Sequence, residues 1–307
     1  MPEEMYALSR LDETFDRTKS LLWPPLRGVW LRLTVIALFV GGSLDLLSNF
    51  DPYLVVSFVL GSIISVMPPI VAVALVGIAL LWWIIGTVLQ FVFVDMLSTG
   101  DIRIRRFFRE RLGKGVRLFL FQVALTLLPA LAGTAFLVAL LGFGRGGGSV
   151  PSIPFYVFIP VMMGVTFLFR IILLLTTDFV VPIMIREDCG AIKGWKRMIG
   201  MISAKFLQIV VYVVGRLTLG FIAGIVCTIL IALALVVTAI PFVLIGTAMF
   251  GPFQTGNYMS FLPLLVPYLI IAIPVVLLIM VPFVTFFRYY GLLVLEGLAP
   301  EYRLLPE

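Results

Sequence analysis

Three arginines and three carboxylates stand inside otherwise apolar stretches of this sequence. Two of these stretches share a frame, FRIILLLTTDFVVP at 169–182 and FRYYGLLVLEGLAP at 287–300. In each frame an acid follows the arginine by eight residues, and a proline follows the acid by four. Charges this deep in apolar sequence are costly and need partners. The six candidate site residues are Arg170, Arg216, Arg288, Asp95, Asp178 and Glu296.

Two interpretations of these charges remain open. A guanidinium is planar and binds phosphate or carboxylate through two parallel hydrogen bonds. The three arginines could therefore line a cavity that faces the cytoplasm and holds an anion such as a phospholipid head group, with the acids as counter-charges. Alternatively, three arginines and three acids neutralise one another and fix the helix register. An arginine layer that the carboxylates do not reach would need an anion.

Helix geometry predicts which charges can meet. Eight residues of helix rise about 12 Å and turn about 80°, so an arginine meets the acid of a neighbouring helix more easily than its own. Arg216 follows Lys205 by eleven residues, which predicts a depth similar to that of Arg170 and Arg288. Pro182 cannot donate to the carbonyl of Asp178, so we expect a hinge or a polar pocket there.

The composition is that of a helical membrane protein. Hydrophobic residues make up 62% of the chain and charged residues 12%, and the mean hydropathy is +1.17. The chain has no histidine and two cysteines at different expected depths. A histidine metal site, a catalytic triad and a Cys–His dyad are therefore excluded. We assign no catalytic residue, cofactor or metal ligand and expect a non-enzymatic protein.

The hydrophobic runs predict an all-α, polytopic transmembrane bundle of about six helices with interfacial amphipathic helices. The amphipathic stretches lie at 6–25, 101–117 and 186–205. Asp45, near the outer end of the first span, is a weak candidate for an ion site, and the apolar stretch 52–67 either re-enters the membrane or lies at its surface. The predicted spans are 29–48, 69–97, 116–142, 154–182, 204–240 and 262–297.

The basic residues predict the orientation. Of 22 lysines and arginines, five lie in 1–32, seven in 98–117, five in 186–205 and one in the C-terminal tail. By the positive-inside rule, both termini of a multi-pass protein of the cytoplasmic (inner) membrane face the cytoplasm. This bias explains the net charge of +6 without nucleic acid as a partner. Membrane lipids are the expected partners of the basic helices.

The charges also mark an internal repeat. A single membrane domain, 1–307, is predicted to contain three parallel units at about 6–97, 101–185 and 190–300. Each unit has a basic amphipathic helix, a span, a loop and a second span that ends in an acid. Parallel repeats occur in transporters, whose sites lie at repeat interfaces. They also occur in helical bundles that transport nothing, so the repeat alone does not assign a function.

Three runs carry a resemblance to known proteins: DFVVPIMIRED at 178–188, GWKRM at 194–198 and FFRYYGLLVLEGLAPEY at 286–302. In these runs the chain resembles a group of uncharacterised prokaryotic six-span membrane proteins. That group is related to the YciC-like proteins and to the membrane domain found beside glycerophosphodiester phosphodiesterases. The resemblance covers nearly the whole chain and implies a helical bundle in the cytoplasmic membrane. It implies no activity and no catalytic residue.

Two functions from different classes follow. The first is a non-enzymatic membrane protein that binds or transports an anionic, lipid-like molecule from the cytoplasmic side. The second is an accessory or scaffold subunit of a larger membrane complex, with protein partners on its apolar faces and basic helices. An intramembrane enzyme is a weaker third, because no nucleophile stands with its base.

Overall fold

The structure is a computed structural model that describes residues 9–40, 69–101, 103–145, 152–250 and 262–306. Within these ranges every regular element is a helix and none is a strand. Asp45 and the apolar stretch 52–67 lie outside the described residues. The α-helices are α2 (Leu11–Leu22), α3 (Arg27–Val40), α6 (Pro69–Thr99), α7 (Ile104–Arg145), α8 (Ser152–Leu175), α9 (Val181–Arg186), α10 (Ala191–Ala204), α11 (Phe206–Phe250) and α12 (Leu262–Leu298).

The long helices identify an integral membrane protein. Among the described residues, five helices are long and apolar enough to cross a membrane. A sixth span results if α2 and α3, which bend by 120° at their junction, count as one. The predicted class, a polytopic helical membrane bundle of about six spans, is therefore confirmed. The division into three repeat units stays a prediction.

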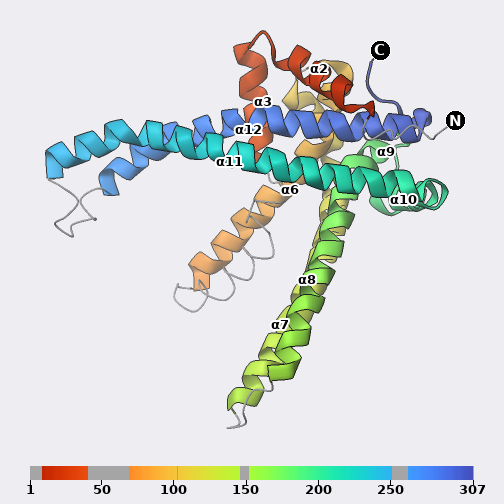
Figure 1. The fold of residues 1–307 in the computed structure, drawn as a ribbon, viewed down its shortest axis with the longest axis horizontal. Coiled ribbons are helices and arrows are strands. Elements are labelled where there is room, and N and C mark those ends of the chain that lie inside the picture. The colour runs from red at the N-terminus through yellow and green to blue at the C-terminus, as the bar shows by residue number, and fades with distance from the viewer. Residues whose placement is uncertain (1–8, 41–68, 102, 146–151, 251–261, 307) are drawn as a thin grey trace.

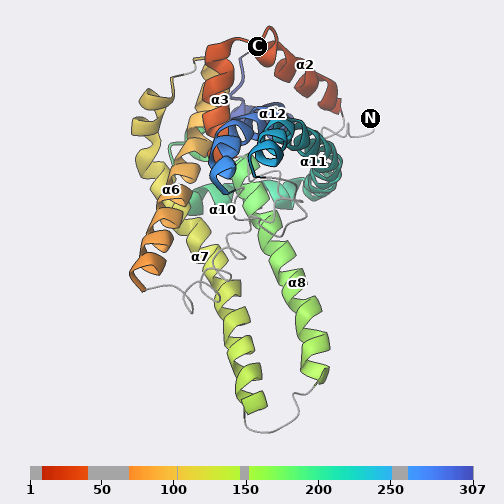
Figure 2. The same ribbon diagram turned by 90° about the vertical axis from the view of Figure 1, so that its left-hand side faces the viewer.

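The helices form arms that leave a common hub in different directions. Helices α7 and α8 make one hairpin, and α11 and α12 make another that points away from it (Figures 1 and 2). Helix α6 packs against both α3 and α7. The hub contains the C-terminal parts of α6 and α12 and the segment directly after α8, where the sequence has Asp95, Glu296 and Asp178.

Burial is concentrated in the hub. Residues 287–295 are all buried, as are all but one residue in each of the segments 86–97 and 175–184. The arms are different, since large apolar side chains such as Leu131 on α7 and Leu233 on α11 are exposed. A water-soluble protein would bury such surface, whereas lipid tails solvate it without cost. The arms are therefore the lipid-facing part of the fold.

One predicted boundary is wrong. The basic stretch 101–117 and the span 116–142 were expected as separate helices, but α7 runs from Ile104 to Arg145 without a break. The stretch contains Gly113 and Gly115 but no proline, and glycine alone weakens a helix without ending it. The corresponding boundary between α10 and α11 is present, and Lys205 separates the two helices.

A π-helical turn, η3 (Thr176–Val180), joins α8 to α9. Its backbone opens by one residue, so that the N–H of Val181 donates to the carbonyl of Thr176, five residues back. Pro182 follows at once and has no N–H to donate to the carbonyl of Asp178. Such turns occur often at functional sites. This turn stands where a hinge or a polar pocket was expected, and Asp178, which belongs to it, is buried in the hub.

Candidate functional site: a buried arginine–aspartate cluster

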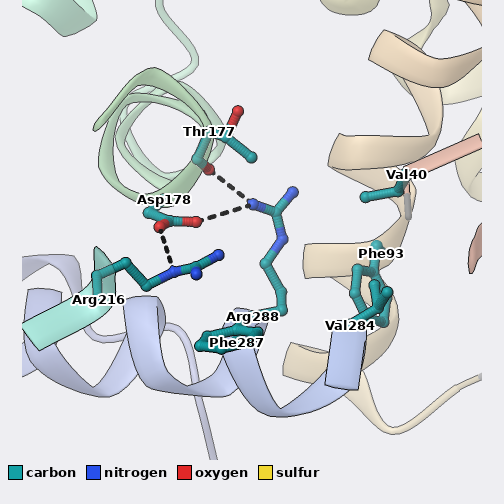
Figure 3. A pocket seen from close by; sticks show the side chains of 8 residues that line it. All are labelled: Val40, Phe93, Thr177, Asp178, Arg216, Val284, Phe287 and Arg288. Atoms are coloured by element: carbon teal, nitrogen blue, oxygen red, sulfur yellow. Dashed lines mark hydrogen bonds and ion pairs between the residues drawn. The ribbon is translucent and has the colours of Figure 1, made fainter. Parts of the chain in front are cut away.

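Three buried charges from three elements meet at the centre of the hub. Asp178 comes from η3, Arg216 from α11 and Arg288 from α12 (Figure 3). Their exposed fractions are 5%, 5% and 4%. The prediction that an arginine meets the acid of a neighbouring element and not the one on its own helix is confirmed for Arg288, which pairs with Asp178 and not with Glu296.

Asp178 is shared between the two arginines. Its Oδ2 lies 3.4 Å from Nε of Arg216, and its Oδ1 lies 3.9 Å from Nη1 of Arg288. Both separations exceed the roughly 2.7–2.9 Å of a strong charge-assisted hydrogen bond. The short contact belongs to Tyr212, whose hydroxyl donates to Oδ2 at 2.7 Å. Tyr212 thus fixes the carboxylate, while the arginines approach it as looser ion pairs.

Arg288 is fixed by backbone carbonyls. Its Nη1 donates to the carbonyl of Thr177 at 2.7 Å, and its Nη2 donates to the carbonyl of Gln90 at 2.9 Å. Thr177 belongs to the π-helical turn and Gln90 to α6, so one guanidinium connects three elements. The hydrogen bonds of its two terminal nitrogens thus go to neutral carbonyls, and Asp178 is approached only as the 3.9 Å ion pair.

Arg216 is held differently, by an aromatic face. Its guanidinium carbon lies 3.8 Å from the centre of the Phe287 ring, the distance of a close cation–π contact. A guanidinium stacked in this way keeps its donors in its own plane, away from the ring. Within the described residues, no group accepts a hydrogen bond from the buried Nε of either Arg216 or Arg288.

A small cavity lies between these side chains. It has about 10 Å³ for a water-sized guest, which is room for about one water molecule. One side of its wall is charged and the other apolar (Figure 3). The lining residues are Val40, Phe93, Thr177, Asp178, Arg216, Val284, Phe287 and Arg288.

The other three candidates lie apart from this cavity. Asp95 forms a two-pronged ion pair with Arg111, with bonds of 2.6 and 3.0 Å. Glu296 pairs with Arg303 at 3.2 Å. Arg170 is half-buried on α8 and does not line the cavity. The structure therefore does not bring the six residues together at one site, as a layer of three arginines below a ring of three carboxylates would.

The charges of the cluster do not balance. Two of the three predicted counter-charges are paired with Arg111 and Arg303, neither of which was among the predicted site residues. Of the carboxylates in the described part of the chain, only Asp178 pairs with Arg216 or Arg288. The cluster thus has one more positive than negative charge. In a water-poor interior, such an excess attracts an anion.

Metal chemistry has no clear centre here. Among the residues that the structure describes, no three side chains of His, Cys, Asp or Glu gather at a spacing that suits a metal ion. What the cluster offers is cationic hydrogen-bond donors beside an apolar wall. That arrangement is suited to binding an anion.

Nearly the whole chain matches the model of one protein family. A family model for a family of unknown function, DUF7544, matches residues 5–305. The chain belongs to this family. No curated protein matches it, and no solved structure matches it. The predicted relation of this DUF7544 chain to the YciC-like proteins stays a prediction.

Sequence reasoning missed several partners in this DUF7544 cluster. Tyr212 carried a usable signal, because it precedes Arg216 by four residues and therefore lies on the same helix face. The roles of the Thr177 and Gln90 carbonyls could not be found from the sequence, since they depend on how three distant segments pack. Arg111 was visible only as one of seven basic residues in 98–117, and nothing in the sequence singled it out.

Proposed function

We propose that this integral membrane protein is non-enzymatic and binds or moves an anionic, lipid-like molecule from the cytoplasmic side. One observation carries the proposal: two buried guanidiniums share a single carboxylate at the centre of the hub. The unbalanced charge is costly unless an anion compensates it. Guanidiniums are well suited to phosphate and carboxylate oxygens.

The surroundings of the cluster favour a lipid-like ligand. Exposed apolar side chains line the arms that lead away from the hub, such as Phe221 and Ile225 on α11. A lipid whose head group sits at the cluster could lay its chains along these faces. A small polar anion would gain nothing from them.

The charge distribution supports access from the cytoplasm. Eighteen of the 22 lysines and arginines fall in the segments assigned to one side, which the positive-inside rule identifies as cytoplasmic. The proposal places the protein in the cytoplasmic membrane with both termini inside. The hub, with the C-terminal parts of α6 and α12 and the segment directly after α8, is then at the cytoplasmic end of the spans. Relation to the YciC-like proteins fits this location but adds no activity.

Native mass spectrometry after gentle extraction from the native membrane tests the proposal. We expect an anionic lipid to be retained on the wild type and lost on Arg216→Gln. The matched control is Arg303→Gln, which removes an arginine paired with Glu296 outside the cavity. Equal retention on all three folded proteins would overturn the proposal.

A second function, an accessory or scaffold subunit, is favoured by the length of α11. This helix has 45 residues, about 68 Å at 1.5 Å per residue, whereas the hydrocarbon core is about 30 Å thick. In the most apolar stretch of this helix, only 6% is buried by the rest of the chain. Helices of a partner protein could cover that surface. A native gel separates the two functions, because a partner at fixed stoichiometry supports the subunit role and a monomer with lipid supports the first.

A further inference from the structure

We infer that the ligand presents a singly charged phosphodiester-like group and that Arg216, not Arg288, binds it. This inference rests on the proposed function and makes it more specific. It concerns the charge of the ligand, the residue that holds it and the size of the group that enters.

The charge follows from the cluster itself. Arg216 and Arg288 contribute two positive charges and Asp178 contributes one negative charge, and each guanidinium has a nitrogen within 3.9 Å of the Asp178 carboxylate. One further negative charge makes the cluster neutral. A doubly charged group would leave a net negative charge in a buried site, where uncompensated charge is strongly unfavourable. A monoanion is therefore the matched ligand.

The choice between the arginines follows from their donors. Both terminal nitrogens of Arg288 already donate to the carbonyls of Thr177 and Gln90. Arg216 stacks on Phe287, and its guanidinium ends between Asp178 and Arg288 (Figure 3). Its in-plane donors can turn to an incoming oxygen without breaking a backbone contact. Arg288 is then a positioning residue that holds the π-helical turn in place.

The size and wall of the cavity favour an ester over a free ion. Room for about one water molecule admits a single anionic oxygen of a head group, with the rest of the head group outside. The wall opposite the charges is made by Val40, Phe93 and Val284. The oxygens that stay outside the cavity are all charged or acidic in inorganic phosphate, whereas in a phosphodiester two of them are neutral ester oxygens with carbon arms, which suit the apolar side of the site.

Lipid competition on the purified full-length protein tests the inference. The probes are phosphatidylglycerol, a monoanionic phosphodiester; phosphatidic acid, a phosphomonoester that can carry a second charge; and zwitterionic phosphatidylcholine. On the wild type we expect phosphatidylglycerol to be retained at least fivefold over both others. Arg216→Gln should lower its retention about tenfold, the loss expected for a charge-assisted contact. Arg216→Lys keeps the charge and should recover only part of the binding.

A charge-shift variant separates this inference from the proposed function. Asp178→Asn keeps the side-chain size and raises the net charge of the cluster to two, so preference should move toward phosphatidic acid. Asp95→Asn is the matched control, because Asp95 is equally buried but pairs with Arg111 away from the cavity. If neither anionic lipid exceeds phosphatidylcholine on the wild type, the proposed function fails. If phosphatidylglycerol and phosphatidic acid bind equally, or if Asp178→Asn does not change the preference between them, the inference that the ligand is a monoanion fails and the proposed function stands. Retention that Arg216→Gln does not change would mean an adventitious lipid only.

Discussion

The guanidinium of Arg288 donates a 2.7 Å hydrogen bond to the backbone carbonyl of Thr177. Thr177 lies in the π-helical turn, where the regular ladder of hydrogen bonds is interrupted ahead of Pro182. A side chain on α12 therefore supplies a donor at the irregular point of another helix. This contact links the shape of the turn to the position of the buried charges.

Replacement of Arg288 should destabilise the fold strongly. Arg288→Met leaves the carbonyls of Thr177 and Gln90 without their donor and removes one positive charge beside Asp178. Asp178 keeps Arg216 as a partner, so the cost comes from the two carbonyls, at about 1–3 kcal/mol for each acceptor left unsatisfied. We expect a large drop in Tm, measured by thermal unfolding in detergent. Arg303→Met, whose arginine is 40% exposed, should lower Tm only slightly, and equal losses for the two variants would contradict the assigned role.

The hydroxyl of Tyr212 should also be important for stability. Tyr212→Phe removes the hydrogen bond to Oδ2 of Asp178 and leaves a buried carboxylate less well solvated. A hydrogen bond to a charged group is worth about 1.5–3 kcal/mol. The control is Tyr268→Phe, which loses a 3.3 Å bond to the neutral carbonyl of Leu235, worth about 0.5–1.5 kcal/mol. Urea or thermal unfolding compares the two, and an equal or smaller loss at Tyr212 would argue against a charged acceptor.

The sequence predicted those features that depend on local pattern. Long apolar runs identified the spans, because a membrane-crossing helix needs about 20 apolar residues. The 80° rotation between Arg288 and Glu296 predicted that Arg288 would meet the acid of a neighbouring element, as it does in Asp178. Pro182 marked the place as special through the hinge or polar pocket expected there, and the structure has a π-helical turn at that point. These inferences required only helix geometry and the chemistry of proline.

Features that depend on packing were not predictable from the sequence. Asp95 and Glu296 looked equivalent to Asp178, yet their partners, Arg111 and Arg303, lie outside the apolar spans. An isolated sequence does not show which of many basic residues folds back onto an acid. The continuity of α7 was missed for a related reason, since charged and apolar stretches differ in composition but nothing between them stops a helix.

The C-terminal tail should be held by a pH-dependent contact. The hydroxyl of Tyr302 donates to Oε1 of Glu187 at 2.7 Å, and Nε of Arg197 donates to Oε2 at 3.3 Å. The bond from Tyr302 is the main cause that lowers the pKa of Glu187 below its ordinary value of 4.5, with Arg197 adding to it. Burial and this same bond raise the pKa of Tyr302 to about 12. The contact therefore persists from neutral pH up to strongly alkaline pH.

The sign of the pH dependence follows from the lowered pKa of Glu187. Its contribution to stability is fully present above pH 4.5 and is lost as the pH falls through the lowered value. We expect the difference in Tm between the wild type and Tyr302→Phe to be constant from pH 7 to pH 5 and to shrink toward pH 3. The difference between the wild type and Tyr268→Phe should not change over this range. A Tyr302 difference that grows on acidification would contradict the assignment.

Helices α6 and α7 approach closely at Gly115. A Cβ built on Gly115 would lie 2.8 Å from Cα of Val88 and would also overlap a methyl group of that residue. Gly115→Ala must therefore push the two helices apart, and overpacking of this kind costs about 1–3 kcal/mol. The shift would also disturb the ion pair of Asp95 with Arg111, because Arg111 is one turn before Gly115 on α7.

Gly113 provides the control on the same helix. A Cβ at this position meets nothing within 4 Å, so Gly113→Ala removes only the entropic cost of glycine in a helix and should stabilise by about 0.5–1 kcal/mol. Thermal unfolding of both variants in the same detergent should thus give shifts of opposite sign. A fall in Tm for both would mean that this helix turn is constrained by something other than the contact with Val88. A rise for both would mean that α6 and α7 are free to separate without cost, and that the hub does not depend on their close packing.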